Sequence, residues 1–493
     1  MITALKNITF AIWILFSTTA FAQVKFEKVY GSTGYDKGYS VAQMYDIGYA
    51  VVGTTTSFGS GSTDVYLLKT DSMGIAVGQK TFGGINIDQA YSIESTSDSG
   101  LVIAGYTNSF GAGGYDMYVI KTDKNCNTVW EKTYGGTNWD FAYSVQQTYD
   151  GGYIIAGGTY SSGNGSEDMY LVKTNSDGDT LWTKTYGGIN DDEIKSIKQT
   201  VDSGFIFTGY TKSMGDVSGD IYAIRTDRNG NTIWTYKYSG GSEDYSYDVL
   251  EDSSGPFPFY YIAGETKISP TNLEGIVLTV GPTGFLVTTK LYVGAAHDGV
   301  NSIAQTVDGR FATVGYTYSF GAGMSDLVMY REKPIGTYAG STSFGGGNID
   351  KGYCIKNTKD GGYIMCGTSL SFSALDRIFL IKTDSMGVAT GGVINTTTGI
   401  NSLSKASGSK FTVYPNPAND AITIVTGLDA SSDTDLIVIV TDLLGREKLS
   451  LPILMNASSS PILLNTQGLE TGVYFINLSG ENYFSAQKLI IQK

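Results

Sequence analysis

A segment of about fifty residues, in which short apolar runs are separated by polar turns, is repeated seven times along this chain. The third copy is the clearest and reads AYSVQQT, YDGG, YIIAGGT, YSSGNGSED, MYLVKT, NSDGD and TLWTKTYGG. Four short runs rich in Tyr, Val, Ile, Thr and Trp are separated by turns of Gly, Asp, Asn and Ser, and none has a helical period. Each copy therefore predicts four antiparallel β-strands.

The spacing of the copies is nearly constant. Successive copies are 52 residues apart, except for an interval of 54 between the fifth and the sixth. The copies open at Tyr30, Phe82, Tyr134, Tyr186, Tyr238, Tyr292 and Phe344. A fixed length is expected when every copy packs against identical neighbours, and four antiparallel strands per copy match one blade of a β-propeller. We therefore predict an all-β fold with a seven-bladed propeller of four-stranded blades over residues 23–394.

The start of the predicted propeller supplies a strand for its end. Residues 24–30, VKFEKVY, match the end of a copy, such as WEKTY at 130–134, and they precede the first complete copy. The last copy degenerates after FLIKTDSMG into VATGGVIN, which is a poor fourth strand. We expect residues 24–29 to form the outer strand of the seventh blade, because ring closure removes the exposed sheet edges that an open stack would leave.

Residues outside the predicted ring have other roles. Residues 1–22 contain Lys6, the apolar stretch ITFAIWILF and the small-x-small site Ala20-Phe21-Ala22, which is the pattern of a secretory signal peptide. Residues 395–410 are rich in Gly, Ser and Thr and predict a flexible linker. A second domain with new short strands follows at 411–493. No other apolar stretch is long enough for a membrane-spanning helix, so we expect no transmembrane segment in the mature protein.

Four motifs in residues 411–493 carry a family resemblance: FTVYPNPANDAITI, VTDLLGREKL, LETGVYFINL and KLIIQK. Together and in this order they resemble the type A C-terminal sorting domain of the Bacteroidetes type IX secretion system. The resemblance implies a small β-sandwich, export through the Sec pathway, the periplasm and the outer-membrane translocon, and removal of the domain by a sortase. The cargo would be secreted or attached to the outer-membrane surface. The residues at the motif positions are Tyr414, Pro415, Asn416, Pro417, Gly445, Arg446, Gly472, Tyr474, Lys488 and Lys493.

Composition and charge limit the partners. The net charge of −14, without any cluster of Lys and Arg, disfavours nucleic acid and anionic membrane surfaces. The 64 glycines and 35 tyrosines suit many short strands and tight turns. Three cysteines, Cys126, Cys354 and Cys366, are too few for a disulfide framework. Simple hairpin registers do not set Cys354 opposite Cys366, so we expect buried free thiols.

Two aspartates recur on the face that carries the longer loops, here called the long-loop face. One lies in the link between blades in all seven copies: Asp36, Asp88, Asp140, Asp192, Asp244, Asp298 and Asp350. The second precedes the third strand in five copies: Asp64, Asp116, Asp168, Asp220 and Asp326. The first set either lines a mouth that holds a cation such as Ca²⁺, which takes six to eight oxygen ligands, or accepts hydrogen bonds within each Gly-rich loop. Recurrence in every copy favours the local role.

Residues that break the repeat are the better candidates for ligand binding. Trp139 and Tyr35 lie beside the recurrent aspartates, with Asp140 next to Trp139, where other copies have Ile, Asp, Glu or His. Aromatic rings beside carboxylates suit a sugar ligand, and loop packing is the alternative. Phe58 and Phe110 recur in SFG loops and predict either an apolar rim for a partner or local packing. His297 is the single histidine and lies in a blade-linking loop.

The sequence contains no catalytic motif of the GxSxG, HExxH or P-loop kind, and we predict no catalytic residue. Trp130, Trp182 and Trp234 recur on the outer strand and are assigned to packing. The first hypothesis is a secreted or cell-surface, non-enzymatic binding or adhesion propeller with a glycan or protein ligand. The alternative is a carbohydrate-active hydrolase or lyase that uses carboxylates of the long-loop face, and a structural spacer is the third hypothesis.

Overall fold

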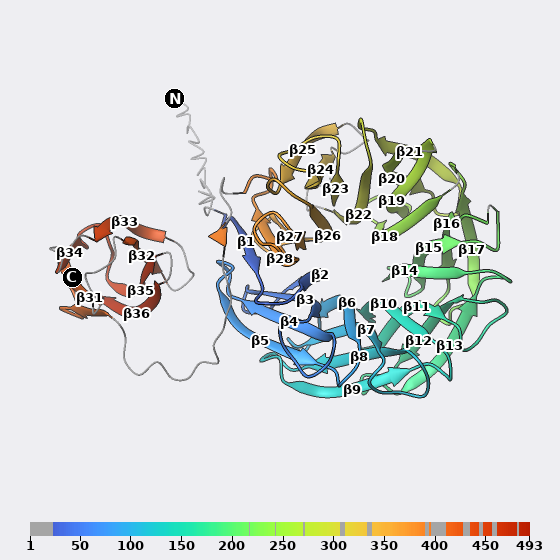
Figure 1. Cartoon of the computed structure of the whole chain (residues 1–493), viewed down its shortest axis with the longest axis horizontal. Helices are drawn as coiled ribbons and strands as arrows, with labels where there is room; N and C mark the ends of the chain where they lie inside the picture. Colours follow the sequence, from blue (N-terminus) through green and yellow to red (C-terminus); the bar gives the residue numbers. More distant parts are fainter. Residues whose placement is uncertain are drawn as a thin grey trace, which may run out of the picture.

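The computed structural model confirms the all-β fold and the seven four-stranded blades (Figure 1). It describes residues 23–215, 217–241, 243–269, 272–305, 311–332, 338–389, 394–395, 411–426, 434–442, 447–455, 461–480 and 483–493. The predicted signal peptide, residues 396–410 of the predicted linker, and both Gly445 and Arg446 lie outside the described residues.

Each blade is an antiparallel sheet whose strands follow the chain from the centre of the ring to its rim (Figure 1). The innermost strands are β2 (Asp36–Gln43), β6 (Asp88–Ser95), β10 (Asp140–Gln147), β14 (Asp192–Gln199), β18 (Asp244–Asp252), β22 (Asp298–Gln305) and β26 (Asp350–Asn357). The second strands are β3 (Tyr49–Thr55), β7 (Leu101–Thr107), β11 (Tyr153–Thr159), β15 (Phe205–Thr211), β19 (Phe259–Ser269), β23 (Phe311–Thr317) and β27 (Tyr363–Ser369).

The outer half of each blade repeats in the same way. The third strands are β4 (Asp64–Thr70), β8 (Asp116–Thr122), β12 (Asp168–Thr174), β16 (Asp220–Thr226), β20 (Asn272–Val280), β24 (Asp326–Glu332) and β28 (Arg377–Thr383). The outer strands are β5 (Ala76–Phe82), β9 (Thr128–Tyr134), β13 (Thr180–Tyr186), β17 (Thr232–Tyr238), β21 (Leu286–Tyr292), β25 (Tyr338–Phe344) and, for blade seven, β1 (Phe26–Tyr30).

The predicted closure of the ring is confirmed. Strand β1 pairs antiparallel with β28 along its whole length, from Phe26 opposite Lys382 to Tyr30 opposite Ile378. A short strand that the sequence did not predict, β29 (Ile394–Asn395), then adds to β1 in parallel as a fifth strand of the sheet. The two ends of the repeat region therefore meet in one blade, which covers the edge that β28 would otherwise expose.

The hydrophobic core lies between neighbouring blades, because each sheet is packed on both faces. One cluster joins Val52 and Leu67 of blade one to Ile93 and Ile103 of blade two, all of them buried. The second strand of blade one, YAVVGTT, is buried at all seven positions. Burial on both faces explains why the second and third strands read as nearly continuous apolar runs instead of alternating ones.

Aromatic residues of the outer strands tie each blade to the next. The hydroxyl of Tyr30 donates to the carbonyl oxygen of Gly74 at 2.5 Å, and Tyr134 makes the equivalent bond to Gly178 at 2.7 Å. Trp130 packs on Tyr153 of the next blade with ring centroids 5.6 Å apart. The repeated tryptophans are partly buried and pack against the core clusters, which agrees with their assignment to packing.

The two cysteines of blade seven correct one expectation. Cys354 and Cys366 are buried free thiols, as predicted, but they are directly opposite each other in the antiparallel pair of β26 and β27. The expected offset was wrong because β26 has a β-bulge between Gly352 and Cys354, which shifts the register by one residue. Hydrogen bonding by Cys366 and the nearby Lys356 ammonium lower the pKa of the Cys354 thiol to about 6.

The C-terminal segment forms the predicted small β-sandwich. A three-stranded sheet contains β30 (Phe411–Tyr414), β31 (Ala421–Thr426) and β34 (Ile462–Asn465). A four-stranded sheet contains β32 (Thr434–Asp442), β33 (Glu447–Met455), β35 (Gly472–Gly480) and β36 (Tyr483–Ile491). Phe411, Ile422, Val440 and Ile476 are among the buried residues that share one core between the two sheets.

Candidate functional site

The recurrent aspartates of the blade links are buried and order their own loops. Asp140 accepts hydrogen bonds from the hydroxyls of Thr159 and Ser161 and from the backbone N–H of Gly136, the last at 2.8 Å. Asp36 and Asp88 have the equivalent partners in their own loops. These are the bonds expected of a local structural role. Within the described ranges, no group of three or more His, Cys, Asp or Glu side chains is arranged to hold a metal ion, and calcium binding stays a prediction.

The residues predicted to bind a ligand all lie on the long-loop face, but in different settings. Trp139 has 52 % of its surface exposed and contacts the rings of Tyr115 and Tyr160 at centroid distances of 5.9 and 6.0 Å. Tyr35 occupies the equivalent repeat position and is also half exposed. The two residues belong to blades three and one, so they do not form one contact surface.

The other predicted residues are engaged locally. The Nδ1 atom of the exposed His297 accepts the backbone N–H of Leu273 at 3.1 Å. Phe58 stacks on Tyr66 with ring centroids 5.4 Å apart, and Phe110 lies 6.1 Å from Tyr118. Phe110 nevertheless keeps nearly half of its surface exposed. These contacts fit local packing, the alternative stated for the SFG loops.

A β-bulge at the same place in every innermost strand creates a feature that the sequence pattern did not reveal. In blade one the register shifts between Gly38 and Ser40, so that Tyr39 has no partner on β3. The equivalent residues of the seven blades are Tyr39, Tyr91, Tyr143, Lys195, Tyr247, Asn301 and Tyr353, here called the channel ring. Bulges re-aim side chains, and here they present one residue per blade to the centre of the propeller.

A recurrent glycine makes room for each bulge. A Cβ atom on Gly53 would lie 1.8 Å from the carbonyl oxygen of Lys37, and Gly105 and Gly157 have equivalent contacts with Gln89 and Phe141. A side chain at this position cannot be accommodated without moving the backbone. The glycine of the second strand therefore allows the bulge that positions the channel ring.

The channel ring and its neighbours line an open cavity of about 400 Å³ in the centre of the propeller. Every member of the ring lines it, together with Glu265, Tyr316 and Lys351. Tyr39 is the middle of a row of three rings, 4.9 Å from Tyr91 and 5.3 Å from Tyr353 between centroids. This volume lies within the range of small-ligand sites.

Most polar tips of these tyrosines are already bonded to the protein. The hydroxyls of Tyr247 and Tyr316 donate to Glu265 at 2.5 and 2.7 Å. Tyr91 donates to Gln89 at 2.7 Å. Burial and the Glu193 carboxylate raise the pKa of Tyr143, so this phenol stays neutral. What the tyrosines leave for a ligand is mainly aromatic ring surface.

An unbroken series of ring contacts, here called the aromatic path, leads from the cavity to the long-loop face. Tyr91 lies 5.8 Å from Tyr106, and Tyr106 lies 5.0 Å from Phe141 in the next blade. Phe141 in turn lies 6.5 Å from Trp139. The exposed Trp139 is therefore the outer end of an aromatic surface that begins in the channel ring.

Two lysines of the cavity have different electrostatic partners. Lys195 Nζ lies 2.8 Å from Glu193 Oε1 and 3.9 Å from the ring centroid of Tyr143. Lys351 Nζ lies 4.4 Å from the ring centroid of Tyr316. No carboxylate of the described residues lies within 4 Å of Lys351 Nζ. Lysine over an aromatic face is favourable, but it does not neutralise the charge.

A buried pair of carboxylates lies beside the aromatic path, between blades three and four. Glu167 and Glu193 each have about 5 % of their surface exposed, and the hydroxyl of Tyr160 donates to Glu167 at 3.2 Å. Burial first, and the neighbouring Glu193 second, raise the pKa of Glu167 to about 8. The Lys195 ammonium faces Glu193, so the two carboxyl groups have different environments.

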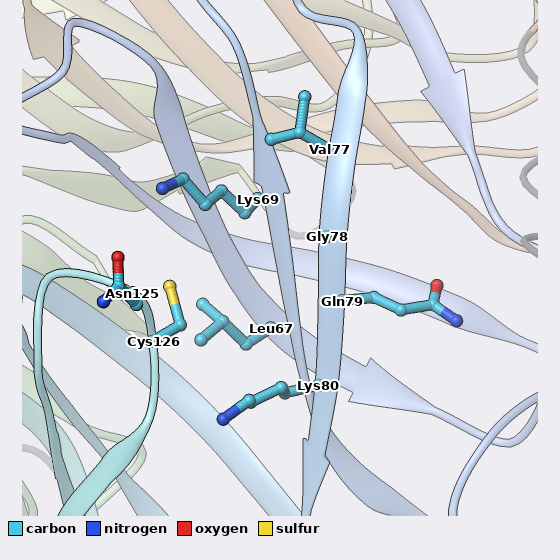
Figure 2. A pocket seen from close by; sticks show the side chains of 8 residues that line it. All are labelled: Leu67, Lys69, Val77, Gly78, Gln79, Lys80, Asn125 and Cys126. Carbon is cyan, nitrogen blue, oxygen red and sulfur yellow. The ribbon is translucent and has the colours of Figure 1, made fainter. Parts of the chain in front are cut away.

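Figure 2 shows a second cavity, of about 370 Å³, on the outer side of blades one and two. Leu67, Lys69 and Lys80 of blade one face Asn125 and Cys126 of blade two across it. The cavity is explained by the repeat, because Gly78 stands where the next three blades carry Trp130, Trp182 and Trp234. The missing indole ring leaves a groove, and we assign no ligand to it.

The motif of the C-terminal sandwich connects its first and last strands. The side-chain amide of Asn416 donates to the carbonyl oxygen of Lys488 at 2.7 Å, and its oxygen accepts the N–H of Ile490 at 2.8 Å. Tyr474 is buried and donates to the carbonyl oxygen of Glu470, whereas Tyr414, Lys488 and Lys493 are exposed. Pro415 and Pro417 flank Asn416, and Gly472 begins β35.

The channel ring could have been found from the sequence by comparing the copies position by position. Three residues after the recurrent aspartate, five copies have Tyr, one has Lys195 and one has Asn301. Directly after the aspartate the copies differ strongly: Lys37, Gln89, Phe141, Glu193, Tyr245, Gly299 and Lys351. The residue types at these two positions differ between copies while the length of the repeat stays constant. This difference could have pointed to the channel ring.

Comparison with known proteins identifies the C-terminal segment. Residues 412–492 match the family model described as a secretion system C-terminal sorting domain. The chain is a cargo of the type IX secretion system with a β-propeller passenger, and this domain directs it to secretion or cell-surface attachment through the translocon. No described helix is long and apolar enough to cross a membrane.

Solved structures similar to this chain include Sqt1 from Chaetomium thermophilum, at 9% identity and a TM-score of 0.42 over 74% of this chain and 100% of that one. YCF48 bound to D1 peptide has 9% identity and a TM-score of 0.42, over 75% of this chain and 100% of that chain. Lignostilbene dioxygenase from Pseudomonas brassicacearum has 9% identity and a TM-score of 0.41, over 79% and 98%. No curated protein matches the sequence.

Proposed function

We propose that this protein is an extracellular, non-enzymatic binding or adhesion propeller whose ligand is a glycan held at the mouth of the central channel. The observation that carries the proposal is the aromatic path from the channel ring to the exposed Trp139. Aromatic rings stack on the apolar faces of sugars, and ring surface is what the bonded tyrosine hydroxyls leave available. A protein ligand is the other class that such a surface accepts.

The proposal includes the route and the division of the chain. Residues 1–22 act as a Sec signal peptide, 23–394 form the passenger, 395–410 act as a linker, and 411–493 are read by the translocon and removed by a sortase. The match of residues 412–492 to a secretion system C-terminal sorting domain supports this route. The passenger then meets its ligand outside the cell.

A glycan array probed with the purified full chain, with and without calcium, tests the proposal. We expect a restricted set of saccharides to bind, with or without calcium, since the recurrent aspartates are bonded within their loops. A second array of extracellular proteins serves as the comparison. Binding to proteins alone, with no saccharide retained, would reject the glycan proposal.

The alternative function, a carbohydrate-active hydrolase or lyase, has one observation in its favour. Glu167, with its pKa raised to about 8, is a proton donor near neutral pH, and the neighbouring Glu193 forms an ion pair with Lys195. Two neighbouring carboxyl groups in different environments are the arrangement used in glycoside hydrolysis. Release of reducing ends from a bound saccharide, abolished by Glu167→Gln, would support the alternative over simple binding.

A further inference from the structure

We infer that the central cavity selects saccharides that carry a carboxylate, and that Lys351 binds this carboxylate. The inference rests on the proposed function and names the class of glycan, a uronic-acid residue held with its ring against the channel tyrosines. Four features of the cavity support it: the charge at Lys351, the contrast with Lys37, the remaining polar groups and the aromatic walls.

Lys351 is the lysine of the cavity for which the described residues supply no ion-pair partner within 4 Å. Its Nζ atom lies 4.4 Å from the ring centroid of Tyr316 and 5.8 Å from that of Tyr318. Within the described part of the chain, no Asp or Glu oxygen lies within 4 Å of it. Glu265, the acidic residue of the cavity lining, accepts hydrogen bonds from the hydroxyls of Tyr247 and Tyr316. An ammonium held in this way attracts an anionic group of a ligand.

Lys37 provides the contrast within the same fold. It occupies the same repeat position as Lys351, one blade further along the ring, directly after the recurrent aspartate. Its Nζ atom lies 3.2 Å from Asp376 Oδ2. Lys195, the other lysine of the cavity, is likewise paired, with Glu193. Of these three lysines, Lys351 is the one whose charge is left for a ligand.

The other groups of the cavity fit a sugar ring beside that charge. The Asn301 side chain donates to the carbonyl oxygen of Gly352 at 2.7 Å, which leaves its amide oxygen as an acceptor for a sugar hydroxyl. Tyr39 and Tyr353 supply adjoining aromatic rings to the cavity that Lys351 also lines. A uronate combines an apolar ring face, hydroxyls and one carboxylate, which matches this set of groups.

Isothermal titration calorimetry of the full chain with trigalacturonate and with neutral galactotriose of the same linkage tests the inference. Three proteins are compared: wild type, Lys351→Met and the matched control Lys37→Met. We expect wild type to bind the acidic trisaccharide about tenfold more tightly than the neutral one, because a hydrogen-bonded charge pair is gained. Lys351→Met should remove this preference, and Lys37→Met should keep it.

The salt dependence gives an independent readout. Raising the ionic strength should weaken binding of the acidic trisaccharide to wild type and leave the affinity for the neutral trisaccharide unchanged. Equal affinity for the two saccharides, or a preference that survives Lys351→Met, overturns the inference while leaving the proposed glycan site intact. Failure of both saccharides to bind, or binding of an acidic peptide in their place, overturns the inference, and the glycan proposal is rejected as well when the array retains no saccharide.

Discussion

At the scale of single residues, the two classes of tryptophan in this molecule have different roles. Trp139 is half exposed at the outer end of the aromatic path, whereas Trp182 contacts Phe205 of the next blade at a centroid distance of 6.2 Å. Trp182 also covers Gly230, whose Cβ position lies 3.2 Å from the indole ring. One residue faces the ligand region and the other fills space between blades.

Replacing each tryptophan by alanine separates these roles. We expect Trp139→Ala to weaken glycan binding by about 1–3 kcal/mol, the scale of a lost stacking aromatic, with little change in melting temperature. Trp182→Ala should leave binding unchanged and lower the free energy of unfolding by about 2–3 kcal/mol, since the ring is only partly buried. Calorimetry and thermal melts of both variants check this, and equal binding by wild type and Trp139→Ala would remove Trp139 from the site.

The buried Glu167 predicts a pH dependence of stability. Its pKa is raised in the folded protein, so folding favours the protonated carboxyl. The contribution of Glu167 to the free energy of unfolding is therefore fully present at acidic pH and is lost as the pH rises from about 4.5 to about 8. Glu167→Gln keeps a neutral side chain at every pH. The difference in melting temperature, variant minus wild type, should therefore be more positive at pH 8.5 than at pH 5. A difference that is the same at both pH values would contradict the assigned pKa.

At the scale of elements, the innermost strand explains what the sequence could and could not predict. The spacing of Tyr30, Phe82 and the later copies was enough to predict seven blades, because unit length and strand pattern are both local. The bulge at Tyr39 could not be read in this way, since it depends on two residues of β2 opposing one of β3. The same bulge at Tyr353 sets Cys354 opposite Cys366. The bulge therefore explains both why the channel ring was not predicted and why the expected offset of the two cysteines was wrong.

The closing strand gives a prediction about a single element. Deleting residues 23–29 removes Phe26 and Val29, which are buried against blade seven and its neighbours, and exposes the edge of β28. Each of these side chains is worth about 1.5–3 kcal/mol of burial, so we expect a loss of at least about 3 kcal/mol and a tendency to aggregate. Thermal melts and light scattering check it, and a truncated chain that melts like the full ring would contradict the closure.

At the scale of the whole molecule, export and binding belong to different parts of the chain. The sorting-domain match covers residues 412–492, and the channel ring is spread over the seven blades from Tyr39 to Tyr353. The export signal could be predicted from the sequence because its motif is contiguous. The channel was not predicted, because each blade contributes one residue to the channel ring and those residues come together only when the propeller closes.

Removing residues 411–493 tests this separation. We expect the shortened chain to fold with the melting temperature of the propeller in the full chain and to accumulate in the periplasm, since the translocon has no domain to recognise. Cell fractionation and thermal melts are the measurements. Surface display or secretion of the shortened chain at the normal level would show that export does not depend on this domain.

The affinity of a Tyr91→Ala variant tests most directly whether the ligand lies in the central channel. Tyr91 contacts Tyr39, Tyr106 and Tyr143 and lines the cavity, whereas Tyr149 is an exposed tyrosine of a tight turn between β10 and β11 on the opposite face. For the saccharide that binds most strongly on the array, Tyr91→Ala should lose about tenfold or more in affinity, and Tyr149→Ala should stay within about twofold of wild type. Unchanged affinity of a folded Tyr91→Ala variant would contradict binding in the channel.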